Sequence, residues 1–356
     1  MSVALAVIGT GVIGTDHVRR LHRQVPGADV AVVTDIDLDL ARAVAATYGV
    51  PEAHTDGFAA IRSAQVDAVV VASSAASHAE LVLAAVEAGK PVFCEKPLAT
   101  TAEACLRIVT AEAAAGRRLV QVGFMRRYDE AYRGLKRTLD SGDLGAALLA
   151  HCVHRNPAVP GSFTNEMMIN EAAIHEIDLV RWLLGEEITD VSVVWPRRNG
   201  HAAATLQDPM LVWLRTTGGV VVDVEVNVNV GYGYDIRTEL VGERGGAWLS
   251  VGNAGVSSVG TAAWVPATWL ERFRAAYDAE LTEWVRAVVT GTDPQGPTAY
   301  DGYAAAVVAD ACVAAFGRDG WHPVPPLHPQ EGRSGRHGRP SFIPQGGVHE
   351  PGPAPY

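Results

Sequence analysis

The first 125 residues alternate between short, continuous apolar runs and longer segments in which apolar residues recur every three or four positions. Continuous apolar runs are typical of parallel strands buried on both faces, and the longer spacing is typical of helices. The runs that predict strands are 3–9, 29–35, 66–73, 91–95 and 118–124. Strands that alternate with helices in this way predict an α/β fold with a doubly wound parallel sheet of the Rossmann type.

The pattern changes after about residue 145, where strands begin to follow one another directly. Residues 210–230 predict two strands joined at Gly218 and Gly219, and residues 234–251 predict a second hairpin. Runs of strands after a β–α–β region predict an α+β domain with a mostly antiparallel sheet. Two helical stretches, WLERFRAAYDAELTEWVRAVV and GYAAAVVADACVAAFG, follow these strands.

The length of the chain, 356 residues, is large for one hydrophobic core, so we expect two domains. We place the first domain at residues 1–125 and the second at 126–328. Residues 329–356 are rich in proline, glycine, arginine and histidine and contain few apolar residues. That composition predicts a disordered tail.

Charge and cysteine content argue against several kinds of partner and location. The net charge of −11 argues against nucleic acid, because phosphate binding needs a basic surface. No apolar run approaches the roughly 20 residues of a membrane span, so we expect no membrane contact. The N-terminal stretch MSVALAVIGTGVIG predicts a strand rather than an export signal, and the four cysteines have no framework spacing. We therefore expect a cytoplasmic protein.

The hexapeptide GTGVIG, residues 9–14, matches the pattern G-x-G-x-x-G between a predicted strand and a predicted helix. In this context Gly9 allows a tight turn, Gly11 lets the backbone approach a pyrophosphate, and Gly14 lets helix and strand pack closely. Val12 and Ile13 lie at the helix N-terminus, whose free N–H groups attract phosphates. The alternative is that these glycines are ordinary turn residues.

Asp35 lies 21 residues after Gly14, at the end of the second predicted strand. A carboxylate at that position accepts hydrogen bonds from the hydroxyls of a cofactor ribose and repels a 2′-phosphate. No arginine follows Asp35 directly. The sequence therefore predicts that the cofactor is NAD rather than NADP.

Lys96 is unusual because only three of the 29 basic residues are lysines. An arginine stays protonated in proteins, whereas a desolvated lysine can give up its proton at moderate cost. Pro97 restricts Lys96 to extended conformations, and Lys96 directly follows a predicted strand at the sheet edge where ligands bind. These features favour a functional lysine over one that remains on the surface by chance.

His175 lies on a helix predicted from about residue 172, with Glu171 four residues before it and Asp178 three residues after it. These spacings place both carboxylates on the same helical face as the histidine. We expect the carboxylates to fix its tautomer and raise its pKa, as suits a general base near neutral pH. The alternatives are a surface salt-bridge cluster or, with His151 and His154, a zinc site. The zinc hypothesis is disfavoured because His151 and His154 are three residues apart on a predicted strand, so their side chains point to opposite faces.

Five further segments extend these observations: EKP, GFMRRYD, HEIDLVRWL, HRNP and YGYDI. Together with the glycine hexapeptide they resemble the Gfo/Idh/MocA oxidoreductase family and, within it, the inositol 2-dehydrogenases. The resemblance covers residues 3 to about 320. It implies NAD-dependent oxidation of a cyclic polyol hydroxyl to a ketone, first of all myo-inositol to 2-keto-myo-inositol. It also implies an open sheet in the second domain through which a homo-oligomer, a dimer or tetramer, often forms.

The resemblance also implies roles for individual residues. Glu95 and Lys96 would lie at the cofactor, with Lys96 beside the reacting hydroxyl, and His175 would act as the base supported by Glu171. The polyol hydroxyls would be held by further side chains, namely Arg126, His154, Asn156, Asp178 and Tyr234. The family usually has an aspartate at position 171 and commonly a threonine or serine at position 172, where this chain has Glu171 and Ala172.

These two departures leave the reaction class intact but put the substrate in doubt, because hydrogen bonds to hydroxyls discriminate strongly between substrates. Another inositol isomer, an aminocyclitol precursor or a pyranose sugar are the alternative substrates. A non-catalytic NAD-binding regulator and a nucleotide-using hydrolase are weaker alternatives. We expect no metal.

Overall fold

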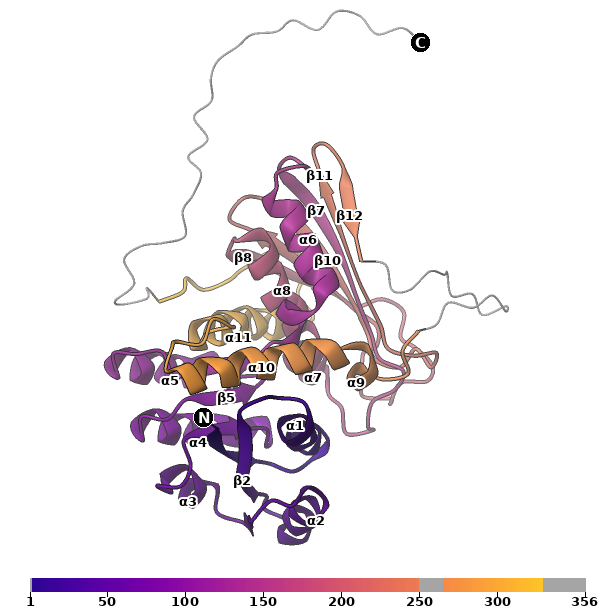
Figure 1. The fold of residues 1–356 in the computed structure, drawn as a ribbon. Coiled ribbons are helices and arrows are strands. Elements are labelled where there is room, and N and C mark those ends of the chain that lie inside the picture. Colours follow the sequence, from indigo (N-terminus) through magenta and orange to yellow (C-terminus); the bar gives the residue numbers. More distant parts are fainter. Residues whose placement is uncertain (1, 250–264, 329–356) are drawn as a thin grey trace, which may run out of the picture.

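The computed structural model describes residues 2–249 and 265–328. Figure 1 shows two parts, a Rossmann part built by the N-terminal residues and a second sheet with its helices above it. The predicted tail, residues 329–356, lies outside the described residues. No helix among the described residues is both long and apolar enough to cross a membrane.

The Rossmann part contains a six-stranded parallel sheet with the strand order β3-β2-β1-β4-β5-β6. Its strands are β1 (Val3–Ile8), β2 (Ala28–Thr34), β3 (Glu52–His54), β4 (Ala68–Val71), β5 (Val92–Glu95) and β6 (Val120–Gly123). The five strands predicted from apolar runs are confirmed. Strand β3 was not predicted because three residues at a sheet edge carry too short a pattern.

Helices cover both faces of this sheet: α1 (Val12–Arg23), α2 (Leu38–Tyr48), α3 (Gly57–Arg62), α4 (Ala75–Glu87) and α5 (Ala102–Ala114). Several of them begin at a side chain that accepts hydrogen bonds from free backbone N–H groups, as Asp37 does for α2 and Thr101 for α5. Helix α2 ends at Gly49, whose φ of 69° is the left-handed conformation that glycine adopts without strain.

The second sheet has seven strands in the order β12-β11-β7-β10-β9-β8-β13. They are β7 (Ala147–Arg155), β8 (Ile188–Val194), β9 (Met210–Thr216), β10 (Val221–Asn227), β11 (Asp235–Gly242), β12 (Gly246–Trp248) and β13 (His322–Pro323). Both predicted hairpins are confirmed, as β9–β10 and β11–β12. Within the described ranges only the β7–β10 pair is parallel, so the sheet is mostly antiparallel, as predicted.

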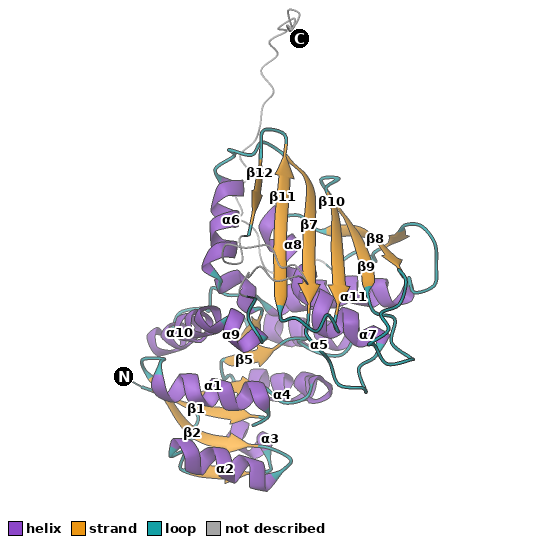
Figure 2. Ribbon diagram, turned by 90° about the vertical axis from the view of Figure 1, so that its right-hand side faces the viewer, coloured by secondary structure: helices purple, strands orange, loops and turns teal. Residues whose placement is uncertain are grey.

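One face of the second sheet carries helices, and the described part of the chain places none on the other face. Figure 2 shows the strands side by side with α8 (Ile174–Leu184) behind them. In β10 every second residue is buried, which is the alternation expected of a sheet covered on one face. The helices on or near the covered face include η1 (Met125–Tyr128), α6 (Glu130–Asp140), α7 (Asn165–Met167), the π-helix η2 (Met168–Ala173) and α11 (Ala299–Ala314).

The segment after the second sheet returns to the Rossmann part. It forms α9 (Trp269–Arg272) and α10 (Arg274–Thr290), and Figure 1 shows α10 across the junction of the two parts. Leu281 and Trp284 of α10 are buried in the same core as Leu5 and Phe93 of the Rossmann sheet. The division at residue 125 stays a prediction, since the packing joins a late helix to the first core.

Candidate active site

A cavity of about 900 Å³ lies where the predicted cofactor loop ends, between β1 and α1. Gly9 has a φ of +94°, and a Cβ on it would lie 2.5 Å from the backbone nitrogen of Ser73. A Cβ on Gly14 would lie 1.9 Å from the carbonyl oxygen of Gly9, whereas nothing lies within 4 Å of a Cβ on Gly11. Gly9 and Gly14 are therefore required for packing, and Gly11 leaves open space along the loop. Val12 and Ile13 line the same cavity.

Asp35 directly follows β2 and lines this cavity. Its Oδ2 accepts hydrogen bonds from the backbone nitrogen of Thr10 at 2.7 Å and from Thr10 Oγ1 at 3.1 Å, and its Oδ1 accepts one from the nitrogen of Asp37 at 3.1 Å. Burial raises the pKa of Asp35, but these hydrogen bonds outweigh burial and hold the pKa below its ordinary value. A negative charge is thus fixed in the cofactor cavity.

A second cavity of about 450 Å³ adjoins the first at the carboxyl edge of the Rossmann sheet. The two cavities share Ile13, Ser73, Ser74 and Trp269 in their linings. Most of the predicted site residues line the second cavity: Glu95, Lys96, His154, Asn156, Glu171, His175 and Tyr234. Segments far apart in the sequence therefore meet around one space, next to the place where a dinucleotide would end.

Lys96 follows β5, as the sequence predicted, and is held by Glu171. Its Nζ donates hydrogen bonds to Glu171 Oε2 at 2.9 Å and to the backbone carbonyl oxygen of Glu171 at 3.0 Å. Glu171 lies in the π-helix η2, directly before α8. The carboxylate expected to steer His175 is therefore paired with Lys96, and it fixes the position of the ammonium group.

His175 lies in the first turn of α8 and is 6% exposed. Its Nδ1 is buried without a hydrogen-bond partner, so only Nε2 is able to reach a ligand in the cavity. Burial, together with the positive charges of Arg126 and Lys96 and the ring of His154, holds the pKa of His175 well below its ordinary value. The predicted rise in this pKa is wrong, because neither neighbouring carboxylate pairs with the ring.

Arg126 does not line the second cavity, although it was expected to bind the polyol. It is 1% exposed in η1 and pairs with Glu176 of α8. Its Nη2 also lies 3.1 Å from Nδ1 of His154, whose ring centroid is 6.2 Å from that of His175. The guanidinium thus stands behind the cavity wall, where its positive charge is compensated by a buried carboxylate.

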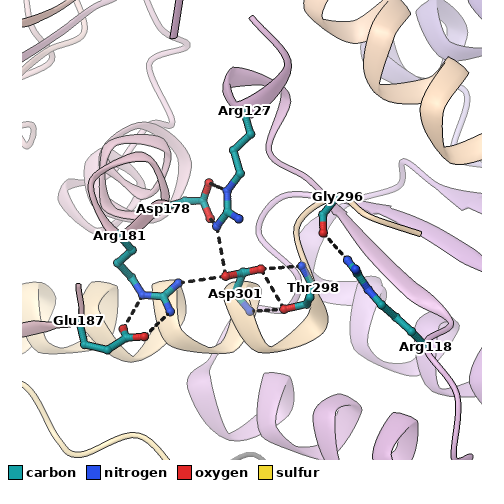
Figure 3. Close-up of polar contacts among 8 residues, drawn as sticks. All are labelled: Arg118, Arg127, Asp178, Arg181, Glu187, Gly296, Thr298 and Asp301. Atoms are coloured by element: carbon teal, nitrogen blue, oxygen red, sulfur yellow. Dashed lines mark hydrogen bonds and ion pairs between the residues drawn. The ribbon is translucent and has the colours of Figure 1, made fainter. Parts of the chain in front are cut away.

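Asp178 is likewise absent from the cavity lining and belongs to the cluster in Figure 3. Its carboxylate accepts a hydrogen bond from Nε of Arg127 at 2.9 Å. Arg127 also pairs with Asp301 at 3.2 Å, and Asp301 pairs with Arg181. The charge of Asp178 is therefore taken up by a buried ion-pair network that joins η1, α8 and α11.

The sequence interpretation missed several lining residues: Ser73, Ser74, His78, Met125, Phe163, Trp269 and Tyr277. Ser73 and Ser74 follow β4 at the same sheet edge as Lys96, so the rule that ligands bind at strand ends could have identified them. Trp269 and Tyr277 belong to the late α9–α10 segment. No sequence signal places that segment beside the glycine loop.

The sheet separates His151 from His154 and His175, the other two histidines considered for a zinc site. The side chain of His151 is 47% exposed and pairs with Asp223, whereas that of His154 is 3% exposed. Strand geometry turns these two residues to opposite faces. In residues 2–249 and 265–328, no group of three His, Cys, Asp or Glu side chains is arranged to hold a metal ion.

A cavity behind a glycine-rich loop, adjoining a second cavity lined by a lysine and a histidine, is typical of nicotinamide-dependent oxidoreductases. Residues 3–124 match the model of an oxidoreductase family with an NAD-binding Rossmann fold. Residues 132–248 match the model of the Gfo/Idh/MocA C-terminal domain. The chain belongs to the Gfo/Idh/MocA oxidoreductase family, and its first domain is an NAD-binding Rossmann domain.

The chain is similar to inositol 2-dehydrogenase of Burkholderia cenocepacia. The two are 51% identical over 322 residues, which cover 88% of this chain and 94% of the relative. Inositol 2-dehydrogenase 3 of Saccharopolyspora erythraea is 51% identical over 318 residues, covering 89% and 94%. Among solved structures, myo-inositol dehydrogenase from Lactobacillus casei in complex with NAD(H) and myo-inositol is 37% identical, with a TM-score of 0.88 and coverage of 92% and 98%.

Proposed function

We propose that this protein oxidises a secondary hydroxyl of a cyclic polyol to a ketone with NAD, and that myo-inositol is converted to 2-keto-myo-inositol. The observation that carries the proposal is that Lys96 and His175 line one cavity that adjoins the cofactor cavity. The names of the similar proteins support inositol as the substrate. When bound, the nicotinamide ring accepts the hydride.

Two side chains divide the remaining chemistry between them. The ammonium group of Lys96 stabilises the negative charge that develops on the reacting oxygen. His175 is neutral because its pKa is low, so its Nε2 is free to accept the hydroxyl proton. Glu171 holds Lys96 in place through the 2.9 Å contact.

The other site residues bind the two ligands. The cofactor side consists of the loop from Gly9 to Gly14 and Asp35, with Glu95 at the junction of the two cavities. On the substrate side, His154, Asn156 and Tyr234 face the polyol together with Lys96, Glu171 and His175. The charge of Asp35 supports NAD over NADP.

Ala172 supports a second candidate, a relative of myo-inositol as the preferred substrate. It lines the cavity and offers no hydrogen-bond donor at a position where the family commonly has one. Another inositol isomer, an aminocyclitol precursor or a pyranose sugar with a different hydroxyl pattern would fit such a site. A non-catalytic NAD-binding regulator is less well supported, because the lysine and histidine are both in place.

We also propose a cytoplasmic homo-oligomer, a dimer or tetramer, that forms through the uncovered face of the second sheet. Large apolar side chains are exposed on its strands, including Leu149 on β7, Trp213 on β9 and Trp248 on β12. Apolar groups gathered on one surface mark a contact site. The four cysteines are free and buried, which fits a reducing compartment.

Formation of NADH by the purified protein should be followed with myo-inositol, scyllo-inositol, an aminocyclitol and glucose in parallel. We expect the highest kcat/KM with an inositol and a clear preference for NAD over NADP. Turnover of glucose alone would replace the inositol assignment with a pyranose. Binding of NAD without oxidation of any of the four compounds would support the regulator instead.

A further inference from the structure

Three buried polar side chains form a cluster directly behind the wall of the substrate cavity. They are Arg126 of η1, His154 of β7 and Glu176 of α8, and they are 1%, 2% and 1% exposed. Nδ1 of His154 lies 3.0 Å from Oε2 and 3.2 Å from Oε1 of Glu176. Glu176 also pairs with Nη1 of Arg126, so the carboxylate bridges the guanidinium and the imidazole.

The chemistry of these groups determines where the proton of the imidazole lies. A guanidinium only donates hydrogen bonds and an ionised carboxylate only accepts them. Nδ1 of His154 lies within reach of both carboxylate oxygens, at 3.0 and 3.2 Å, and also 3.1 Å from Nη2 of Arg126, which is a donor. Because Nη1 of the guanidinium already pairs with Glu176 and two acceptor oxygens face Nδ1 against one donor, we assign the proton to Nδ1, which donates a hydrogen bond to Glu176. Nε2 then carries a lone pair, and His154 lines the substrate cavity.

We propose that Glu176 is a positioning residue, which holds His154 in the tautomer that presents Nε2 to the cavity as an acceptor for a substrate hydroxyl. The proposal rests on the proposed function, because it identifies how one polyol hydroxyl is recognised. Arg126 pairs with Glu176 and keeps its carboxylate ionised. The carboxylate and guanidinium touch no ligand themselves, so neither is a catalytic residue.

The electrostatic surroundings agree with this arrangement. Burial lowers the pKa of His154, and Arg126 and Lys96 add to this effect, while Glu176 opposes it. Burial raises the pKa of Glu176, but Arg126 and His154 outweigh burial and leave the pKa below its ordinary value. The imidazole is therefore neutral and the carboxylate ionised near neutral pH.

A second histidine–carboxylate pair on the same strand provides a matched control. His151 lies three residues before His154 on β7 and pairs through Nδ1 with Asp223 of β10. The side chains of this pair are 47% and 39% exposed on the opposite face of the sheet. The Asp223→Asn change thus removes a carboxylate from a histidine without touching the substrate cavity.

The kinetic test uses Glu176→Gln, His154→Asn and the double variant. A glutamine turns its oxygen to Arg126 and its N–H to Nδ1, which favours the wrong tautomer. His154→Asn keeps a donor toward Glu176 but removes Nε2. Each single change should raise KM for myo-inositol roughly tenfold or more, the effect of leaving a buried polar group unpaired. The NAD dissociation constant should change by less than about twofold.

In the His154→Asn background, Glu176→Gln should have almost no further effect on KM, because both changes act through Nε2. If Glu176→Gln raised KM as much in the His154→Asn background as in the wild type, the proposal would be wrong. An equal rise in KM for Asp223→Asn would likewise indicate that Glu176 has only a general structural role. If the wild-type protein oxidised none of the polyols, the proposed function itself would be contradicted.

The wild-type protein provides a readout that does not depend on the variants folding. Nitrogen NMR of histidine-labelled protein should show His154 protonated on Nδ1, with its signals identified by their loss in His154→Asn or, if that variant does not fold, by sequential assignment. Adding myo-inositol with NADH, which does not react with it, should shift the Nε2 signal of His154. A proton on Nε2, or no shift at a concentration that saturates binding, would overturn the proposal.

Discussion

The two cavities are built in different ways. The cofactor cavity is formed almost entirely by residues 8–81, with Trp269 added from α9. The substrate cavity is formed by the ends of β4 and β5, the helices η1, η2 and α8, the strand β7, and residues of the α9–α10 segment. The first depends on a local backbone shape and the second on side chains that meet only in the folded chain. The two sites should therefore respond separately to mutation.

The largest effect is expected from the two groups that act on the reacting hydroxyl. Lys96→Ala and His175→Ala should each lower kcat by at least about two orders of magnitude, since charge stabilisation and proton transfer each contribute that much. His175→Ala should leave the NAD dissociation constant nearly unchanged, as measured by fluorescence titration, because the ring belongs to the substrate cavity. His151→Ala, on the outer face of β7, is the control and should keep kcat.

Lys96→Arg tests what the lysine supplies. A guanidinium retains the charge but is bulkier and keeps its proton, so we expect little rescue. Near-wild-type turnover in either alanine variant, on the best substrate of the panel, would place the chemistry on other residues.

The second expected effect is the pH dependence of polyol oxidation. Because burial and the nearby positive charges hold the pKa of His175 well below its ordinary value of 6.5, the ring is already neutral at pH 7. The rate should therefore rise with pH only in the acidic range, by about tenfold per unit below the pKa, and should be level around neutrality. Rates at saturating NAD and myo-inositol measure this limb, and it should disappear in His175→Ala. A midpoint above pH 6.5 would show that the ring gains a carboxylate partner when the ligands bind.

The third effect concerns the cofactor cavity alone. Replacing Asp35 by Ser removes a fixed negative charge that would face the 2′-phosphate of NADP, so the preference for NAD should fall by at least about tenfold. KM for myo-inositol should stay within about twofold of the wild type, because Asp35 does not line the substrate cavity. Ratios of kcat/KM for the two cofactors measure the effect. An unchanged ratio would remove Asp35 from cofactor selection.

The sequence predicted the cofactor cavity better than the substrate cavity, and the reason is physical. The glycine loop and Asp35 are defined by backbone turns and strand ends, which nearby residues determine. The pKa of His175 depends first on burial and then on Arg126, Lys96 and His154, which come from three other segments. The same holds for Asp178. It lies three residues from His175 on the helix, as predicted, but its carboxylate pairs with Arg127, which also pairs with Asp301. No local sequence pattern indicates this ion pair.

The fold shows the same contrast between features that nearby residues determine and features that depend on distant contacts. The long apolar runs predicted five of the six strands of the first sheet, and the glycine-linked hairpins predicted β9–β10 and β11–β12 of the second, whereas β8 and β13 were not predicted. The three-residue strand β3 and the return of α10 to the first core were not predicted. A short edge strand has too few positions to show a period, and a helix pattern does not identify which sheet the helix covers.

Asp178→Asn should separate stability from substrate binding. Among the described residues, the change leaves Arg127 with Asp301 as its remaining carboxylate partner, and breaking a buried ion pair costs about 3–5 kcal/mol when no other partner remains. We expect a smaller loss here, seen as a lower Tm. KM for myo-inositol should stay within about twofold, since Asp178 lies outside the cavity lining. A large rise in KM at unchanged Tm would return Asp178 to the substrate site.

The smallest effect is expected at Glu280 in α10, the helix that packs against the Rossmann core and contributes Tyr277 to the substrate cavity. Glu280 is completely buried, and neither carboxyl oxygen has a hydrogen-bond partner. Burial and the nearby Glu95 raise its pKa well above the ordinary 4.5. An acid whose folded pKa is raised contributes its full stability below the unfolded pKa, and that contribution is lost as pH rises through the folded pKa.

Glu280→Gln, which has no proton to lose, should therefore be more stable than the wild type at pH 8, by on the order of 1 kcal/mol in free energy of unfolding. The difference should shrink as the pH falls, and should be smallest below 4.5, where the wild-type carboxyl becomes protonated in the unfolded as well as the folded state. Urea unfolding at several pH values measures it, with the exposed Glu239→Gln as a control. Because Glu280 lines neither cavity, KM for NAD and for myo-inositol should not change. A variant less stable than the wild type at pH 8 would mean that Glu280 is ionised and paired in the folded protein.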